Sequence, residues 1–179
     1  YIHGKKLMVT GKPPFRIIRA FNNARFYKTD LSGKCDSIHS SQATNLTQLL
    51  GNPVLWNMET QMTGDVMHLI GNKATQKLDS LKILNNTFII SKDTIGTGYN
   101  QVKGLNLYGK FKDGKIHETD IIKNTEVIYY LRNDDNELIG INKNVSSRIN
   151  IIFDGDTVDT MTFFTDVDGD IYPEAELPE

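Results

Sequence analysis

Cysteine, histidine and serine side chains occur together in one short segment, and such groups can form a nucleophile with its base. Cys35 and His39 lie four residues apart, with serines between and beyond them. We expect this segment to be a strand, where residues at that spacing share a face but are separated by roughly 13 Å. A thiol and an imidazole so far apart do not exchange a proton. We therefore interpret both residues as structural.

Aspartates alternate with other residues near the end of the chain, as they do in calcium-binding loops. The run Asp166-Val167-Asp168-Gly169-Asp170 has its glycine fourth, whereas an EF-hand loop needs glycine at its sixth position and glutamate at its twelfth. We interpret this run as a solvent-exposed terminal turn. Because His3, His68 and His117 also lack a second ligand at metal-binding spacing, we expect no metal and no other cofactor.

Paired carboxylates are a further pattern that supports catalysis, here Glu118 with Asp120 and Asp156 with Asp159. Carboxylates on the solvent face of an antiparallel sheet are nevertheless the ordinary expectation. The sequence also has no glycine-rich turn leading from a strand into a helix, as nucleotide-binding loops and nucleophile elbows require. We expect a protein that is not an enzyme.

Length and composition favour a single folded domain. The 179 residues are enough to bury a sizeable core, and the single cysteine, Cys35, forms no internal disulfide. The net charge is −2, with lysines and acids interspersed, which argues against nucleic acid as a partner. The apolar runs are far shorter than the roughly 20 residues of a membrane helix. The chain starts at Tyr1 without an initiator methionine or a leader, so we expect a processed product or an excised part of a longer protein.

Apolar residues recur at every second position along most of the chain, which is typical of strands with one buried face. The clearest examples are Leu107, Gly109 and Phe111; Val127, Tyr129 and Leu131; and Ile149, Ile151 and Phe153. The polar segment 42–50 is predicted to be a strand with its turn, and a short helix is the alternative there. We find no window with helical apolar spacing and good helix formers. An all-β fold is therefore expected.

Glycine, asparagine and aspartate separate these runs about every ten residues, because they tolerate the positive φ angles of turns. The predicted turns are 112–114, 133–136, 154–156 and Leu31-Ser32-Gly33. Short, evenly spaced and loosely similar strands favour a stacked β architecture, in which neighbouring units bury one another's apolar faces.

Several segments, taken in order, resemble one family. Asn52-Pro53-Val54-Leu55-Trp56 followed by the segment 61–66 is similar to a stretch of the OstA-like proteins, which are related to the lipopolysaccharide transport protein LptA. The segments 103–111, 114–116 and 124–127 resemble the strand and turn repeat of that family, and 147–173 resembles its closing strands. Lys123-Asn124 replaces the Gly-Asn that the family's repeat often carries.

This resemblance implies an open V-shaped β jelly roll, or β-taco, of stacked short antiparallel strands forming a single OstA-like domain over residues 1–179. It implies a non-catalytic, lipid-binding module that carries or bridges lipopolysaccharide toward the outer membrane, in the periplasm of a Gram-negative bacterium. Water rejects acyl chains by about 0.8 kcal/mol per methylene, so this transport needs a continuous apolar groove. The residues expected on its interior face are Leu107, Phe111, Val127, Tyr129, Leu131, Ile149, Ile151, Phe153, Met161 and Phe163. For each of them, a place in an ordinary closed core is the alternative to lipid contact.

Two other functions fit the same strands: a carbohydrate-binding or carbohydrate-processing β-solenoid, and a structural envelope protein.

An open stack of antiparallel strands has an unpaired strand at either end, and this strand can pair with another chain. We expect 172–179, with its prolines and acids, to leave the sheet, and Arg16-Ile17-Ile18-Arg19-Ala20-Phe21 to remain able to pair. The predicted partners are lipopolysaccharide, other envelope transport components bound through strand edges, and further copies of the chain, head to tail.

Overall fold

The computed structural model describes residues 1–28, 31–75, 77–155 and 157–173, and in these ranges the protein is built from strands and turns alone. Sixteen strands form one antiparallel sheet. No helix long and apolar enough to cross a membrane occurs in the described ranges. The expected all-β class is confirmed.

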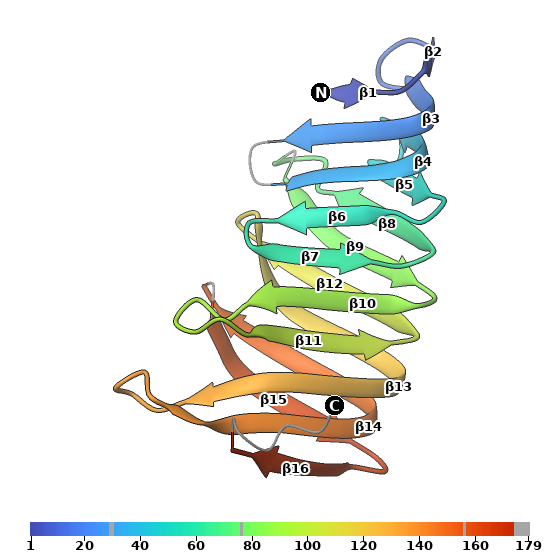
Figure 1. The fold of residues 1–179 in the computed structure, drawn as a ribbon. Coiled ribbons are helices and arrows are strands. Elements are labelled where there is room, and N and C mark those ends of the chain that lie inside the picture. Colours follow the sequence, from blue (N-terminus) through green and yellow to red (C-terminus); the bar gives the residue numbers. More distant parts are fainter. Residues whose placement is uncertain (29–30, 76, 156, 174–179) are drawn as a thin grey trace.

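The strands stack from β1 and β2 at the top of the molecule to β16 at the bottom (Figure 1). The first eight are β1 (Ile2–His3), β2 (Lys6–Thr10), β3 (Ile17–Lys28), β4 (Leu31–Ser41), β5 (Leu46–Leu50), β6 (Val54–Asn57), β7 (Thr60–Thr63) and β8 (Val66–Gly71). The others are β9 (Leu78–Leu84), β10 (Thr87–Lys92), β11 (Tyr99–Gly104), β12 (Asn106–Lys112), β13 (Lys115–Arg132), β14 (Leu138–Asp154), β15 (Thr157–Phe164) and β16 (Asp168–Tyr172).

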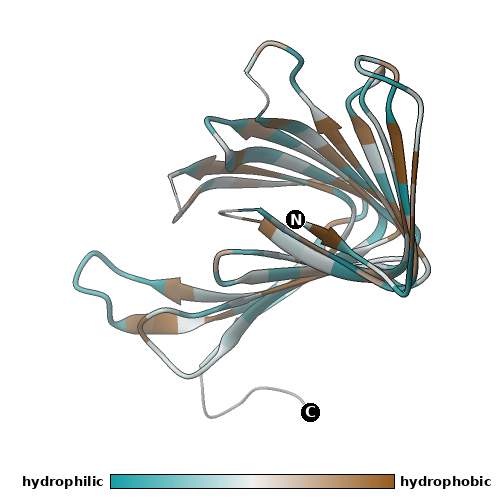
Figure 2. Ribbon diagram, turned by 90° about the horizontal axis from the view of Figure 1, so that it is seen from above, coloured by the Kyte–Doolittle hydropathy of each residue, from teal (hydrophilic) through white to brown (hydrophobic). Residues whose placement is uncertain are grey.

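The sheet is folded along one line, which we call the corner, into two arms. Arm A contains β2, β5, β8, β9, β12 and β15, and arm B contains β1, β6, β7, β10, β11 and β16. Four strands cross the corner and contribute a half to each arm: β3, β4, β13 and β14. Seen from above, the strands fan out from this shared corner (Figure 2). The expected V-shaped jelly roll is therefore confirmed, although these four strands are long, with 11 to 18 residues.

The corner is formed by pairs of consecutive residues with positive φ, between 49° and 78°. There are five such pairs: Asn22-Asn23, Gly51-Asn52, Asn85-Asn86, Lys123-Asn124 and Thr165-Asp166. The second member is asparagine in four pairs and aspartate in the fifth, the residues other than glycine that adopt this conformation most readily. Lys123-Asn124 has the same conformation as Gly51-Asn52, so the departure from Gly-Asn does not change the turn.

The same hydrogen bond closes every pair. In each pair, the backbone carbonyl of the first residue accepts a hydrogen bond from a backbone N–H of the segment in which the chain last crossed the corner. The N···O distances are 2.9 to 3.2 Å. The donors are Lys5, Asp36, Asp65, Leu105 and Ser147, and each follows a small residue: Gly4, Cys35, Gly64, Gly104 and Ser146. A Cβ at Gly64 would collide with the Ile83 side chain. Close approach of the chain at the corner therefore limits the side chains there.

The predicted turns at 112–114 and 133–136 are confirmed, and the reversal after Asp154 is confirmed up to Gly155. The segment 42–50 is also the predicted strand with its turn. The predicted turn Leu31-Ser32-Gly33 is wrong, because these residues open β4 and pair with β3 and β6. Gly33 is needed inside the strand, where a Cβ would lie 2.5 Å from the Phe26 ring.

Both predictions for the ends of the stack need correction. The segment 16–21 is not a free edge, because β3 is paired with β2 on one side and with β4 on the other. Tyr172 does not leave the sheet but pairs with Ile141 in β14, and residues 174–179 lie outside the described ranges. Asp168-Gly169-Asp170 belongs to β16 instead of forming a turn. The edge strands are β1 and β2 at the top and β15 and β16 at the bottom.

Two threonines on β13 are equally buried but differ in the hydrogen bonds that their hydroxyls make. Thr119 and Thr125 are each 1% exposed. The Thr125 hydroxyl lies 2.7 Å from the Ser146 carbonyl, to which it donates, whereas the Thr119 hydroxyl has no partner in the described part of the protein. A buried hydroxyl without a partner loses its hydration without compensation.

We expect Thr119→Val to raise the free energy of unfolding by about 1 kcal/mol, and Thr125→Val to lower it by about 1 to 2 kcal/mol. Valine keeps the shape of threonine while removing its hydroxyl, so the two substitutions form a matched pair. Equilibrium unfolding in denaturant measures both. Equal destabilisation by the two substitutions would contradict the assignment of an unpaired hydroxyl to Thr119.

Candidate functional site: the interior face between the arms

The interior face of arm A carries an apolar ladder next to the corner. Register places Ile38, Leu49, Met67, Ile83, Leu107, Ile121, Ile149 and Phe163 opposite one another across eight consecutive strand segments. All except Phe163 are at most 1% exposed. A second ladder, one step further from the corner, includes Leu69, Leu81, Ile151 and Met161. Alternation along each strand places these side chains on one continuous face.

Arm B contributes a matching apolar ladder from its own strands. Its members are Leu55, Met62, Ile89, Val102 and Val127, joined in register from β6 to β13. These residues belong to the same hydrophobic cluster as the ladders of arm A. The two arms therefore share one apolar interior, although in the described part of the chain their strands are joined only through the four strands that cross the corner.

The ten residues predicted for the lipid-binding face come from both arms. Nine belong to the shared cluster or pack against it, and Leu131 is half-buried near the tip of arm B, outside the cluster. Leu107, Val127 and Ile149 are 0% exposed and Ile151 is 3% exposed. The half-buried members are Phe111, Tyr129, Phe153, Met161 and Phe163. The four buried residues are packed near the corner, whereas the half-buried ones keep part of their surface accessible.

Other interior residues were not predicted. Ile38, Leu49, Leu55, Met62 and Met67 are buried in the same ladders but come from the first half of the chain. Alternation in 46–50 and 66–70 was the available signal. The neutral polar residues Asn57, Thr60, Ser91 and Asn142 on arm B were also missed, because a polar residue in a strand is usually assigned to the solvent face.

The groups considered for nucleophilic catalysis have separate structural roles. Burial raises the pKa of the Cys35 thiol to about 11, and its Sγ donates to the Ser37 carbonyl at 3.2 Å. His39 Nδ1 instead accepts from Arg19 Nε at 3.3 Å. The thiol is therefore protonated near neutral pH, and the His39 ring contacts Arg19 instead of the thiol.

The carboxylates of β13 lie on the outer face of arm A in ion pairs. Glu118 accepts from Lys110 Nζ at 2.7 Å, and this hydrogen bond lowers the pKa of Glu118. Asp120 accepts from Arg148 at 2.5 Å. Asp159 is exposed, and Asp156 lies outside the described ranges. Glu118 and Asp120 thus bind cations of neighbouring strands, as expected for a solvent face.

Two open depressions lie along the corner and not on the interior ladders. One of about 350 Å³ is lined by Asn86, Thr87, Phe88, Lys103, Gly104, Leu105, Lys123 and Asn124. The other, of about 250 Å³, is lined by 52–54, 63–65 and Asn86. Among the described residues no group of three or more histidine, cysteine, aspartate or glutamate side chains is placed to hold a metal ion.

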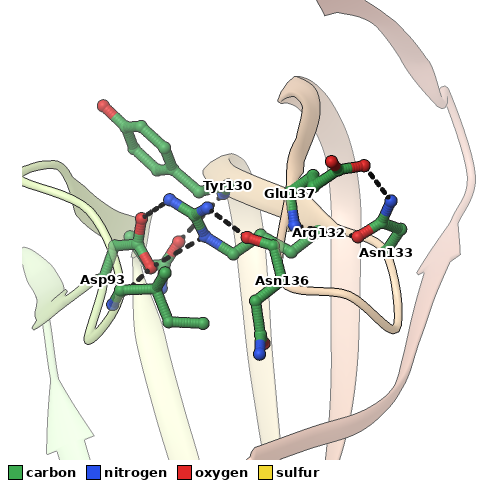
Figure 3. A network of polar contacts seen from close by, with 8 residues as sticks. Asp93, Tyr130, Arg132, Asn133, Asn136 and Glu137 are labelled. Carbon is green, nitrogen blue, oxygen red and sulfur yellow. Dashed lines mark hydrogen bonds and ion pairs between the residues drawn. The ribbon is translucent and has the colours of Figure 1, made fainter.

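A polar network fixes two loops at the tip of arm B (Figure 3). Asp93, 6% exposed, follows β10 and accepts from Arg132 Nε at 3.2 Å and Nη2 at 2.5 Å. Arg132 Nη1 also donates to the Asn136 carbonyl in the next loop at 2.8 Å. The hydrogen bond from Arg132 lowers the pKa of Asp93. The ion pair therefore connects the β10–β11 and β13–β14 loops beside the interior face.

We expect Asp93→Asn to lower the free energy of unfolding by about 1 to 3 kcal/mol near neutral pH, because it removes the carboxylate that accepts two hydrogen bonds from the Arg132 guanidinium. The folded-state pKa of Asp93 is depressed, so its stabilisation is complete above the unfolded value of about 3.9 and is lost as the pH falls through the folded pKa. Unfolding curves measured from neutral to acidic pH should show parent and variant converging. The exposed Asp134→Asn serves as control, and an equal effect there would contradict this role of Asp93.

Comparison with known proteins identifies the fold. No family model and no curated protein matches the chain. Among solved structures, the fold matches the crystal structure of LptH from Pseudomonas aeruginosa, described as the LptA-homologous periplasmic component of the conserved lipopolysaccharide transport device. The TM-score is 0.60 at 14% sequence identity, over 80% of this chain and 95% of LptH. The chain therefore has the open β-jelly-roll fold of the LptA-like proteins.

Proposed function

We propose that this protein is a non-catalytic, periplasmic lipid-binding module that carries or bridges lipopolysaccharide toward the outer membrane of a Gram-negative bacterium. The observation that carries the proposal is the single apolar interior shared by two arms that are joined along the corner. The likeness to LptH, a protein described as part of a lipopolysaccharide transport device, supports the same function.

An acyl chain gains most from such an interior. Each methylene moved from water into an apolar surface gains about 0.8 kcal/mol, and the gain requires no fixed polar anchor. Aliphatic and aromatic side chains in register over many strands give contacts of similar strength along the stack, so a chain can move along them without meeting a single strong trap. Movement of a lipid across an aqueous compartment needs this property.

The half-buried residues are the first contact surface in this proposal. Phe111 and Phe153 of arm A and Tyr129 of arm B keep accessible surface further from the corner, whereas Leu107 and Val127 are fully buried beside it. A ligand would meet the half-buried residues in the observed conformation.

We expect Phe153→Glu to reduce the affinity for lipopolysaccharide at least tenfold, because a carboxylate on the apolar interior face loses its hydration when acyl chains cover it. The adjacent Ile152→Glu is the matched control, since Ile152 is opposite Glu118 and Thr160 on the outer face. Binding is measured by co-purification with quantified lipid and by titration, on variants whose unfolding curves show a folded protein. A folded Phe153→Glu variant that binds as the parent does would show that this face is not the lipid site.

The two ends of the stack are suited to joining copies of the chain head to tail, or to joining it to other transport components. All five residues of β2 are exposed, and β2 and β15 pair on one side only. Leu7, opposite Ala20, is on the interior side of β2 and is 52% exposed. Pairing of β2 with β15 of another copy would place Leu7 beside the end of the arm A ladder, and the apolar interior would continue across the junction.

We expect weak, concentration-dependent association that Leu7→Asp reduces, because an inward-pointing charge protects a strand edge. Met8→Asp places the same charge on the outer side of β2 and should associate as the parent does. Sedimentation over a wide concentration range measures this. A species that remains monomeric at high concentration, or a closed dimer that adds no further copy, would contradict head-to-tail pairing.

A further inference from the structure

The interior rows furthest from the corner differ in chemistry between the arms. On arm A the half-buried residues of this row are apolar: Leu78, Phe111, Ile116, Phe153 and Val158. On arm B the corresponding row contains Asn57, Thr60, Ser91, Asn100, Tyr129 and Asn142. We call this second set the polar row. Register joins Asn57 to Thr60, Thr60 to Ser91 and Ser91 to Asn100.

Some members of the polar row have structural partners. Asn100 Oδ1 accepts the Tyr130 N–H at 3.0 Å, and Asn142 Oδ1 accepts from Asn144. Thr60 and Ser91 are different. They lie opposite each other on β7 and β10, are half-buried, and their hydroxyls make no hydrogen bond to the described part of the protein. Two neighbouring hydroxyls on the interior face are therefore available to donate hydrogen bonds to a ligand in place of water.

We propose that the polar row binds the carbonyl-containing linkages of an acylated ligand, with Thr60 and Ser91 as donors, while the acyl chains lie against arm A and the corner. This inference rests on the proposed function and adds the orientation of the ligand between the arms. None of the six residues in the row is charged at neutral pH, so the row matches ester and amide carbonyls, which are neutral acceptors, and not phosphates or carboxylates.

The physical reason for such an arrangement is desolvation. The carbonyl of an ester or amide that enters an apolar interior without a donor loses its hydrogen bonds to water at a net cost. Hydroxyls and amides along one wall replace those bonds at successive strands, and the other wall stays apolar for the chains. A ligand that moves along the stack would thus exchange one neutral donor for the next.

The test compares two lysophospholipids that share a head group and one saturated chain, with the chain linked by an ester in one and by an ether in the other. We expect the parent to bind the ester about three- to tenfold more tightly, as the loss of one or two hydrogen bonds predicts. In the double variant Thr60→Val and Ser91→Ala, this preference should disappear through weaker ester binding, while ether binding is unchanged. Thr63→Val, on the outer face of β7, should keep the preference.

The inference is overturned if the parent does not prefer the ester, or if the double variant keeps the preference. The proposed function is tested separately, by binding of purified lipopolysaccharide to the same preparations. A parent that binds lipopolysaccharide without an ester preference would refute the orientation and leave the proposed function standing. A parent that does not bind lipopolysaccharide would refute the proposed function whatever the lysophospholipids show.

Discussion

The hydrogen bond at the corner is the constraint on which the rest of the structure depends. In the described part of the chain, five pairs of consecutive residues with positive φ lie at the corner. In each pair the carbonyl of the first residue accepts a hydrogen bond from the N–H of the segment in which the chain last crossed the corner. Because this bond recurs at one place in every turn of the chain, the chain passes from one arm to the other along the same line and the arms share one interior. The side chains near it must be small, as at Gly64, where a Cβ would collide with Ile83.

This constraint explains why the strand pattern and several turns could be predicted from sequence but the corner could not. Alternation at Leu107, Val127 and Ile149 reports burial directly. The corner pairs share only an asparagine or aspartate and lie at increasing separations along the chain, so no strict repeat is visible. Gly33 was assigned to a turn because glycine usually signals one, whereas here the Phe26 ring occupies the place of a side chain. The requirement for glycine at this position can be recognised only when the neighbouring strand β3, which carries Phe26, has been placed.

The interior combines two requirements that oppose each other. Close packing of Leu107, Val127 and Ile149 beside the corner stabilises the fold and leaves little surface for a ligand. The residues nearer the tips, such as Phe153 and Tyr129, keep accessible surface and contribute less to stability. The Asp93–Arg132 pair at the tip of arm B holds two loops beside this accessible region. Sequence reasoning found the apolar side chains but could not rank them, because burial depends on the opposite arm.

In the proposed function, acyl chains lie between the two arms of the protein. A photoreactive amino acid placed at position 153, on the interior face, and separately at position 152, on the outer face, tests it most directly. After irradiation with lipopolysaccharide, mass spectrometry of the intact protein should show a lipid adduct at position 153 and little at position 152. Equal labelling at the two positions, or labelling at 152 alone, would contradict a lipid site in the interior.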